Sequence, residues 1–243
     1  MKFLDLYISH RRLVRQMIFL HKIGPHKQIN LMPVIKIHAL GKHQAWAVWH
    51  ITETEDELSR TAMEICPDKI INQQKRLEWT AARAMARTIL ESFGAAYFGI
   101  DKNEFGKPFL KNNPHHISLS HSYPYVMVQI DDQHDIGVDL EQPKEKLRIV
   151  ARRVFSESEV NDAANDLVKL CIYWCAKEAL YKYYGKRNLL FTDHLKVDPF
   201  HLGSKGYLVG RIAFDGNETI VHLQYLVERD YVLVFTSPEI LAV

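Results

Sequence analysis

The sequence predicts an α+β protein of two similar halves, each with a long helix followed by antiparallel strands. Apolar residues recur at helical spacing over 69–93 and again over 167–184, which predicts the two long helices. Strand-like runs rich in aromatic and β-branched residues follow each helix. Because Tyr125-Val-Met-Val and Tyr231-Val-Leu-Val occupy equivalent places in this order, we interpret the halves as a duplicated unit.

The first half opens with a predicted strand at 45–51, which is rich in aromatic and β-branched residues. The acidic residues at 53–57 begin a short polar helix, and the long helix of 69–93 ends at Gly94. A loop punctuated by glycine and proline comes next. Two further strands are then expected, at 117–120 and 125–130, and a third, at 137–141 just after the boundary between the halves, precedes Pro143.

The second half repeats this plan. Ser156-Glu157-Ser158-Glu159 has the pattern of a capping box and predicts the start of a helix. The longer helix of 167–184 ends at Gly185, and strands are expected at 207–214, 219–225 and 231–236. No linker rich in glycine, proline or serine separates the halves, so we expect them to share an interface.

We therefore divide the chain into a basic N-terminal extension (1–31), an N-terminal half (32–135) and a C-terminal half (136–243). The extension carries six lysines and arginines against one acidic residue, Asp5. It lacks the small-residue cleavage site of a secretory signal. Three interpretations stay open: a start codon assigned too early, with Met32 as the true start; a basic surface arm; or a targeting segment.

Composition narrows the function classes. The 243 residues are 47% hydrophobic and 25% charged, as in a soluble globular protein, and no run of 18 apolar residues predicts a membrane helix. A net charge of +2 gives nucleic-acid binding no support. Three sparse cysteines are typical of a cytoplasmic protein, and we expect Cys171 and Cys175 to be core residues.

Acidic residues give the strongest candidate site. Asp139 and Glu141 share one face of their predicted strand, because side chains alternate along a strand. If Glu178 of the 167–184 helix meets them, three carboxylates converge and favour Mg²⁺; the alternative is an exposed strand end. Lys182 follows Glu178 by one helical turn and lies on the same face. It either pairs with Glu178 at the surface or supplies a positive charge beside the metal, as a polyphosphate substrate requires. Lys177 points elsewhere on the helix.

Two further motifs carry polar or basic side chains. Ser120-His121-Ser122 ends a strand without the G-x-S-x-G pattern of a serine hydrolase, so these side chains are better suited to holding an anion. Gly106-Lys107-Pro108 places a lysine in a stiff turn, which by itself is an ordinary feature of a loop.

Together, the motifs resemble the 4′-phosphopantetheinyl transferases, in particular their larger, single-chain class with an internal pseudo-twofold. The resemblance covers residues 33–243. Its motifs, in order, are Gly106-Lys107-Pro108, Ser120-His121-Ser122, Gly137-Val138-Asp139-Leu140-Glu141, Phe155-Ser156-x-x-Glu159 and Trp174-Cys175-Ala176-Lys177-Glu178-Ala179-x-x-Lys182. The sequence departs from the family at Ser118, where asparagine is common, and at Asn188, which stands where a second glycine is usual.

The resemblance implies a holo-[acyl-carrier-protein] synthase type of reaction. The phosphopantetheine arm of coenzyme A is attached to a serine of an acyl or peptidyl carrier protein, with release of 3′,5′-ADP. It implies Mg²⁺ on Asp139, Glu141 and Glu178, and coenzyme A on Arg83, Lys107, Ser120, His121 and Lys182. Glu178 and Lys182 would be catalytic, with either Glu178 or a metal-bound water accepting the serine proton.

Two other functions compete with this one: a Mg²⁺-dependent nuclease or phosphodiesterase, and a non-catalytic module that binds coenzyme A or a carrier. We expect a cytoplasmic monomer without nucleic-acid or membrane partners. The run from 144 to 153 has five basic residues and one acid, so it is either a solvated charge run or a docking surface for an acidic carrier. If this segment is helical, Arg148 and Arg152 align on one face.

Overall fold

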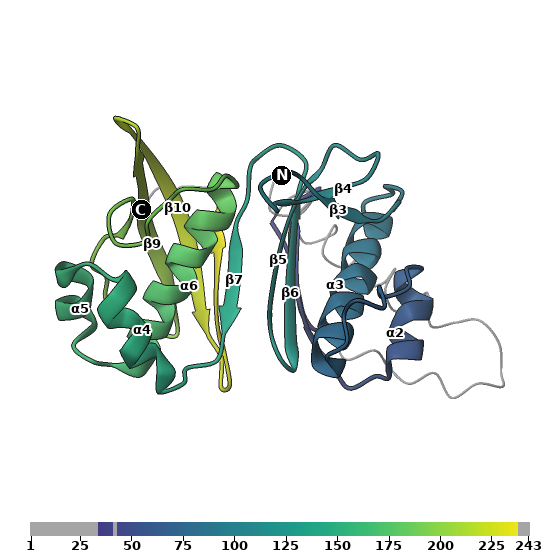
Figure 1. Cartoon of the computed structure of the whole chain (residues 1–243), viewed down its shortest axis with the longest axis horizontal. Helices are drawn as coiled ribbons and strands as arrows, with labels where there is room; N and C mark the ends of the chain where they lie inside the picture. Colours follow the sequence, from purple (N-terminus) through teal and green to yellow (C-terminus); the bar gives the residue numbers. More distant parts are fainter. Residues whose placement is uncertain (1–33, 41–42, 238–243) are drawn as a thin grey trace, which may run out of the picture.

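The computed structural model describes residues 34–40 and 43–237. Two antiparallel sheets pack against each other, and a long helix covers the outer face of each (Figure 1). The α+β class expected from the sequence is confirmed; the pseudo-twofold relation between the halves stays a prediction. Residues 1–31, expected to form a basic extension, lie outside the described residues, as does Met32.

The first sheet has the strand order β1-β2-β6-β5 and is covered by α3. A short helix, α2, packs on α3, and a small hairpin of β3 and β4 lies between α3 and β5 in the chain. The bounds are β1 Val34–Ala39, β2 Ala45–His50, α2 Glu55–Ala62, α3 Gln73–Ser92, β3 Ile100–Lys102, β4 Pro108–Leu110, β5 His116–Ser122 and β6 Tyr125–Asp131.

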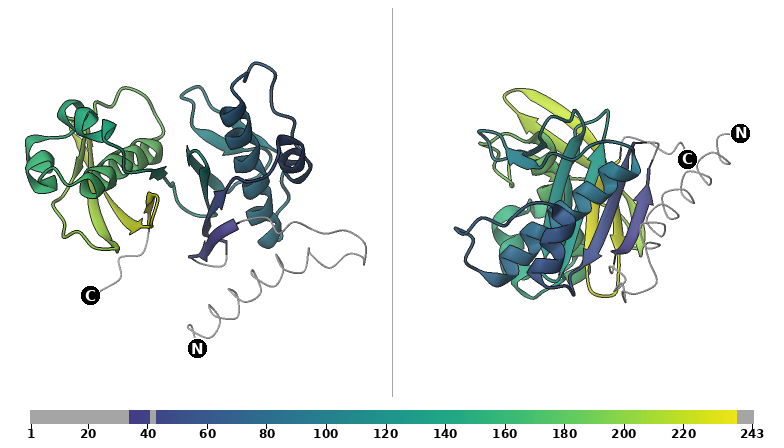
Figure 2. Two further views of the ribbon diagram at one scale, coloured as in Figure 1. Left: turned by 90° about the horizontal axis from the view of Figure 1, so that it is seen from below. Right: turned by 90° about the vertical axis from the view of Figure 1, so that its right-hand side faces the viewer.

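The second sheet has the order β7-β11-β10-β9-β8 and is covered by α6. Two shorter helices, α4 and α5, pack on α6. The bounds are β7 Val138–Glu141, α4 Lys146–Val154, α5 Glu157–Ala163, α6 Leu167–Tyr184, β8 Leu195–Val197, β9 Lys205–Phe214, β10 Asn217–Val227 and β11 Val232–Thr236. The left view of Figure 2 shows the elements of the two halves as separate groups.

The central strands are buried on both faces, because each sheet lies between its helix and the other sheet. Along β6, Tyr125 and Met127 face the inter-sheet core, whereas Val126 and Val128 face α3. The two similar segments noted in the sequence meet at this interface, where the rings of Tyr125 and Tyr231 lie 4.7 Å apart. The expected interface between the halves is therefore confirmed.

Several predicted boundaries shift for local reasons. Helix α3 begins at Gln73 rather than at 69, because the Asn72 side chain accepts a hydrogen bond from the backbone N–H of Lys75 and caps the helix. Helix α6 has the predicted bounds, and Gly185 ends it with a φ of 67°. Strands β3, β4 and β8 were not predicted, because each has only three residues. Strand β1 was also not predicted, although its Ile35-Lys36-Ile37-His38 segment alternates apolar and polar residues.

All three cysteines are buried free thiols, and Cys171 and Cys175 belong to the core beneath α6, as expected. Among the described residues, no helix has both the length and the apolar character needed to cross a membrane. The connection between β6 and β7 joins the two halves, and the boundary proposed at 135/136 lies within it.

Candidate active site at the junction of the two halves

Strand β7 carries two of the candidate carboxylates. Val138 and Leu140 face the inter-sheet core, so Asp139 and Glu141 project from the opposite face, toward α6. Asp139 is 6% exposed, whereas the Glu141 side chain is more accessible at the end of the strand. The shared face predicted for the two acids is therefore the face on which α6 packs.

Helix α6 brings Glu178 and Lys182 to this face. Lys182 Nζ lies 2.7 Å from Asp139 Oδ1 and also donates to the backbone oxygen of Val138 at 2.9 Å. The close approach of helix and strand depends on Gly137, since a Cβ atom there would lie 1.9 Å from the backbone oxygen of Ala179. Lys182 is therefore held beside Asp139 rather than being paired only along the helix surface.

Glu178 occupies a protected position beside these groups. Burial, and then the nearby charge of Asp139, raise the pKa of Glu178 to about 7, although Lys182 opposes the shift. A carboxyl group with this pKa can gain and lose a proton near neutral pH. Glu178 is therefore suited to acid–base chemistry or, when ionised, to holding a cation.

The three carboxylates do not form a closed cluster in the described structure. In the described part of the chain, Asp139, Glu141 and Glu178 do not have ligand atoms that all lie within 4.8 Å of one another. Asp139 and Glu178 interact electrostatically, whereas Glu141 bonds to Ser122 and to Lys146 instead. Oxygen donors on two neighbouring elements still fit a hard divalent cation such as Mg²⁺.

Alternate serines of β5 hold β7 in place. Ser120 Oγ donates to Asp139 Oδ1 at 2.6 Å, and Ser122 Oγ donates to Glu141 Oε1 at 2.6 Å. Ser118 Oγ accepts from the backbone N–H of Val138 at 3.1 Å. Ser118 and Ser122 were not selected from the sequence as site residues, although their two-residue spacing is the signal that could have found them.

His121 lies on the other face of β5 from Ser120. Its Nδ1 is 3.1 Å from Glu78 Oε2 on α3, and Glu78 also accepts from the backbone N–H of Tyr123. The sequence analysis placed Ser120 and His121 in one anion site, but strand alternation separates them. His121 faces the cleft described below, whereas Ser120 contacts Asp139.

Arg83 is positioned by its own helix. Its guanidinium lies 3.4 Å from the ring centroid of Trp79, and its Nε is 3.4 Å from Glu64 Oε2. Burial lowers the pKa of Arg83, with Glu64 acting in the opposite direction. Trp79 and Glu64 were not selected from the sequence; the four-residue spacing of Trp79 and Arg83 on a helix is the available signal.

Lys107 links the β3–β4 hairpin to the second half. Its Nζ is 2.8 Å from Asp135 Oδ1 and donates to the backbone oxygen of Tyr183 at 3.2 Å. Burial by itself would raise the pKa of Asp135, but the hydrogen bonds and charges of Lys107 and His116 lower it. The end of α6 and the turn of Gly106-Lys107-Pro108 thus meet through Lys107.

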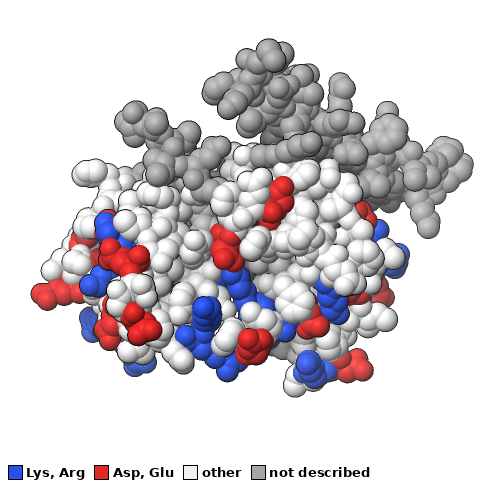
Figure 3. Space-filling model, turned by 90° about the horizontal axis from the view of Figure 1, so that it is seen from above, with Lys and Arg blue, Asp and Glu red and all other residues white. Residues whose placement is uncertain are grey.

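A cleft of about 930 Å³ connects these residues. Its lining comes from α3, the β3–β4 hairpin, β5 and the end of α6, and includes eight lysines and arginines against three acidic residues. Figure 3 shows basic side chains gathered near the middle of one face of the molecule. The basic lining residues are Lys69, Lys75, Arg83, Lys102, Lys107, Lys111, Lys182 and Lys186.

The cleft lies next to the carboxylates without being lined by them. Lys182 lines the cleft and also contacts Asp139, so it joins the two parts of the candidate site. His121, Lys107 and Arg83 line the cleft, whereas Ser120 does not. A basic cleft that ends beside carboxylates is suited to a polyphosphate ligand and a divalent cation.

Two conspicuous charged residues of the motifs are structural. Lys177 is 0% exposed and lies 2.7 Å from Glu159, which is 1% exposed. Lys177 also donates to three backbone oxygens, and Glu159 completes the capping box of α5 and accepts from the backbone N–H of Val197. Because these contacts connect α6 with α4, α5, β8 and the segment that precedes β8, Lys177 and Glu159 stabilise the second half.

Helix α4 presents the basic run next to the carboxylates. Lys146 at its start lies 3.4 Å from Glu141, and Arg148 is held by Glu145 at 2.8 Å and by the backbone oxygen of Asn165. Arg152 is exposed one turn after Arg148, and Ile149 beside it is 63% exposed. Residues 146–154 form a helix, so the condition under which Arg148 and Arg152 were expected to align on one face is met.

The sequence of this chain is similar to a family of known activity. Residues 135–236 match the model of the 4′-phosphopantetheinyl transferase superfamily. This segment contains β7, α4, α5, α6 and most of the second sheet, together with Asp139, Glu141, Glu178 and Lys182. The similarity therefore includes the strand and the helix that meet at the candidate site.

Curated relatives from three organisms agree with the family match. The 4′-phosphopantetheinyl transferase AcpT of Salmonella typhi is 30% identical over 131 residues, covering 49% of this chain and 66% of the relative. The 4′-phosphopantetheinyl transferase Sfp of Bacillus subtilis is 35% identical over 100 residues, covering 39% and 44%. The L-aminoadipate-semialdehyde dehydrogenase-phosphopantetheinyl transferase of Saccharomyces cerevisiae is 34% identical over 113 residues, covering 40% of each. These alignments thus span two fifths to about two thirds of each relative.

Proposed function

Because this chain belongs to the 4′-phosphopantetheinyl transferase superfamily, we propose that it transfers the 4′-phosphopantetheine group of coenzyme A to a serine of an apo carrier protein. The observation that carries the proposal is the basic cleft that ends at Lys182 and Asp139, beside Glu178. Its volume of about 930 Å³ is within the range of small-molecule sites.

The cleft residues would bind the phosphates of coenzyme A. In this proposal His121, Lys107 and Arg83 hold the nucleotide end with its 3′-phosphate, and Lys182 contacts the phosphate under attack. The excess of basic residues supports this assignment, since coenzyme A carries a pyrophosphate and a 3′-phosphate. Ser120 would act through Asp139, whose carboxylate it contacts, rather than by touching the nucleotide.

Asp139, Glu141 and Glu178 would hold Mg²⁺ next to the pyrophosphate. Bound there, the ion would neutralise the negative charge of the phosphates. The donor set supports this role, because all three residues offer carboxylate oxygens and Asp139 and Glu178 already interact. Lys182 contributes a fixed positive charge on the same side of β7.

In the reaction, the carrier serine oxygen attacks the phosphorus that bears the pantetheine arm. A new P–O bond forms, the pyrophosphate bridge breaks, and 3′,5′-ADP leaves with the electron pair. We assign the serine proton to Glu178, because this carboxylate lies next to Asp139 and Lys182, where the cleft ends. Positioning and charge neutralisation, rather than a covalent enzyme intermediate, would supply the rate enhancement.

We also propose that the acceptor is an acidic carrier that docks on α4, and that the enzyme works as a monomer in the cytoplasm. The ion pair of Lys146 with Glu141 supports the docking site, because it links the start of α4 to the proposed metal residues. Three free thiols support the cytoplasmic assignment.

The decisive experiment incubates the full chain with coenzyme A, Mg²⁺ and a panel of apo carrier proteins. We expect intact-mass measurement to detect one added phosphopantetheine group on a carrier, with release of 3′,5′-ADP. Asp139→Asn should abolish the reaction, and the exposed Glu104→Gln should not. Cleavage of nucleic acid or of a phosphodiester without a carrier would indicate the nuclease alternative, and binding of coenzyme A without turnover would indicate a binding module.

A further inference from the structure

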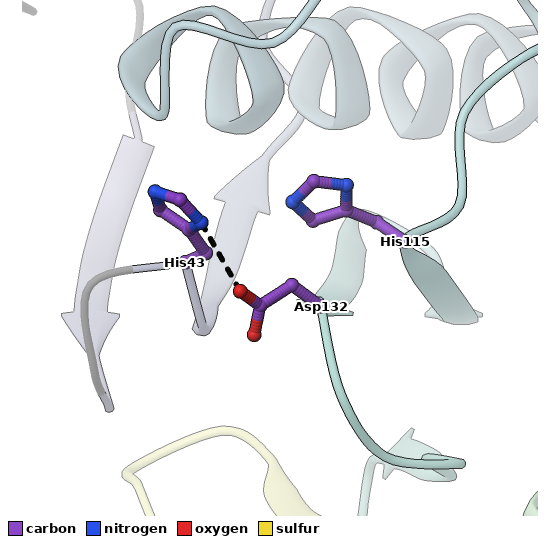
Figure 4. Close-up of side chains that lie close together, drawn as sticks. All are labelled: His43, His115 and Asp132. Atoms are coloured by element: carbon purple, nitrogen blue, oxygen red, sulfur yellow. Dashed lines mark hydrogen bonds and ion pairs between the residues drawn. The ribbon is translucent and has the colours of Figure 1, made fainter.

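A second group of potential ligands lies at one end of the first sheet, outside the candidate active site. His43 lies between β1 and β2, His115 immediately precedes β5, and Asp132 immediately follows β6. One ligand atom from each lies within 4.8 Å of the other two (Figure 4). None of the three residues lines the basic cleft.

The arrangement of His115 points to a ligand. Its Nδ1 lies 2.7 Å from Asn113 Oδ1, and that oxygen also accepts from the backbone N–H of His115 at 3.0 Å. Asn113 Nδ2 donates to the backbone oxygen of Ala96, which fixes the orientation of the amide. Nδ1 of His115 must therefore carry the proton, which leaves the lone pair on Nε2.

This lone pair has no hydrogen-bond partner. Nε2 of His115 is buried and, within the described part of the chain, makes no hydrogen bond. Figure 4 shows the free ring nitrogen directed toward His43 and Asp132. A buried acceptor that is left unpaired carries a free-energy cost, and a bound cation would remove this cost.

The other two ligands are already paired with each other. His43 Nδ1 lies 3.1 Å from Asp132 Oδ2, a separation close to the ligand–ligand distance of about 3.3 Å expected in a tetrahedral zinc site. The ligand atom of His115 lies within 4.8 Å of both of these atoms. Two imidazoles and one carboxylate are typical zinc ligands, and a hydrogen bond such as that of Asn113 is typical of the second shell.

We propose that His43, His115 and Asp132 bind one Zn²⁺ ion, with water in the remaining coordination position. The ion would join three loops: the β1–β2 turn, the segment before β5 and the β6–β7 connection. The last of these also carries Asp135, the partner of Lys107 in the cleft. The site would therefore stabilise the first half and the connection to the second.

The test measures Zn²⁺ content and thermal stability of the full chain, with Mg²⁺ in excess to compete for the proposed carboxylate site. After equilibration with Zn²⁺ and dialysis, we expect His43→Ala and Asp132→Asn each to retain one Zn²⁺ fewer per chain than the wild type. The control is His134→Ala, an exposed neighbouring histidine outside the group. At Zn²⁺ about 100-fold above Kd, the wild-type Tm should rise by roughly 5–10 °C, and the Tm of Asp132→Asn should not.

Cobalt gives an independent reading that does not depend on stability. Co²⁺ bound to the wild type should give the intense visible absorption of a four-coordinate site with nitrogen and oxygen ligands, and Zn²⁺ should displace it. Asp132→Asn, which preserves side-chain size, should lose this spectrum while remaining folded by circular dichroism. The proposal is wrong if the wild type retains no more Zn²⁺ than Asp132→Asn does, or if His134→Ala loses the ion and His43→Ala keeps it.

Discussion

At the scale of single residues, the pKa of Glu178 gives a stability prediction. Burial and Asp139 raise this pKa from 4.5 to about 7 in the folded chain, so folding favours the protonated form. The stability contributed by proton binding is complete below pH 4.5 and is lost as pH rises through 7. In the absence of metal, raising the pH from 5 to 8 should therefore destabilise the wild type through Glu178, whereas glutamine at this position does not titrate. The free energy of unfolding of Glu178→Gln should rise relative to that of the wild type between these two pH values.

Urea unfolding in the presence of a chelator checks this prediction at the two pH values. The exposed Glu104→Gln serves as the control and should change little relative to the wild type. If the difference between Glu178→Gln and the wild type is the same at pH 5 and pH 8, Glu178 does not have a raised pKa in the folded chain.

Residues of the cleft should affect coenzyme A binding more than chemistry. Lys107→Ala and His121→Ala each remove a donor for a non-reacting part of the donor substrate, so we expect KM for coenzyme A to rise roughly tenfold, with a smaller change in kcat. The same variants should discriminate less between coenzyme A and its form lacking the 3′-phosphate. Steady-state kinetics with both donors measures this, and equal losses on both would separate these residues from the 3′-phosphate.

At the scale of elements, Gly137 sets the distance between β7 and α6. A Cβ atom there would lie 1.9 Å from the backbone oxygen of Ala179, so Gly137→Ala must displace the helix that carries Glu178 and Lys182. We expect a loss of about 1–3 kcal/mol of stability together with a large fall in kcat. The control is Gly203→Ala, whose Cβ would meet its nearest atom at 3.3 Å. Unchanged kcat in folded Gly137→Ala would show that helix position is not critical.

Helix α4 gives a prediction about the carrier. Exposed charges at the rim of an interface mainly affect the rate of association and its salt dependence. Replacing Arg148 and Arg152 together with glutamate should raise KM for an acidic carrier, flatten its salt dependence and leave KM for coenzyme A nearly unchanged. Kinetics at low and high ionic strength test this. An unaltered carrier KM at low ionic strength would place docking on another surface.

At the scale of the whole molecule, the inter-sheet core should make the two halves unfold together. Met127 is fully buried in this core, so Met127→Ala should cost about 2–5 kcal/mol and shift a single transition. Leu202→Ala, at a position that is 44% exposed, should have little effect. Circular dichroism and tryptophan fluorescence should give coincident curves; separate transitions for the two halves would contradict a shared core.

The candidate site was only partly predictable from sequence, and the reason differs between residues. The pair of Asp139 and Glu141 and the pair of Glu178 and Lys182 follow from the periods of a strand and a helix, which are local properties. Whether the helix pair meets the strand pair depends on how α6 packs, and packing depends on the close approach at Gly137. From the sequence alone, we could say only that the three carboxylates would converge if α6 packed with Glu178 toward β7.

The sequence by itself determined the order of the principal elements, the bounds of α6 and the shared faces of its charged residues, because hydrophobic period and capping residues act over a few positions. Only the tertiary structure decided that Ser120 contacts Asp139 while His121 faces Glu78, and that His43, His115 and Asp132 meet. These contacts join residues 19 to 89 positions apart, whose proximity is set by sheet pairing and packing rather than by local sequence.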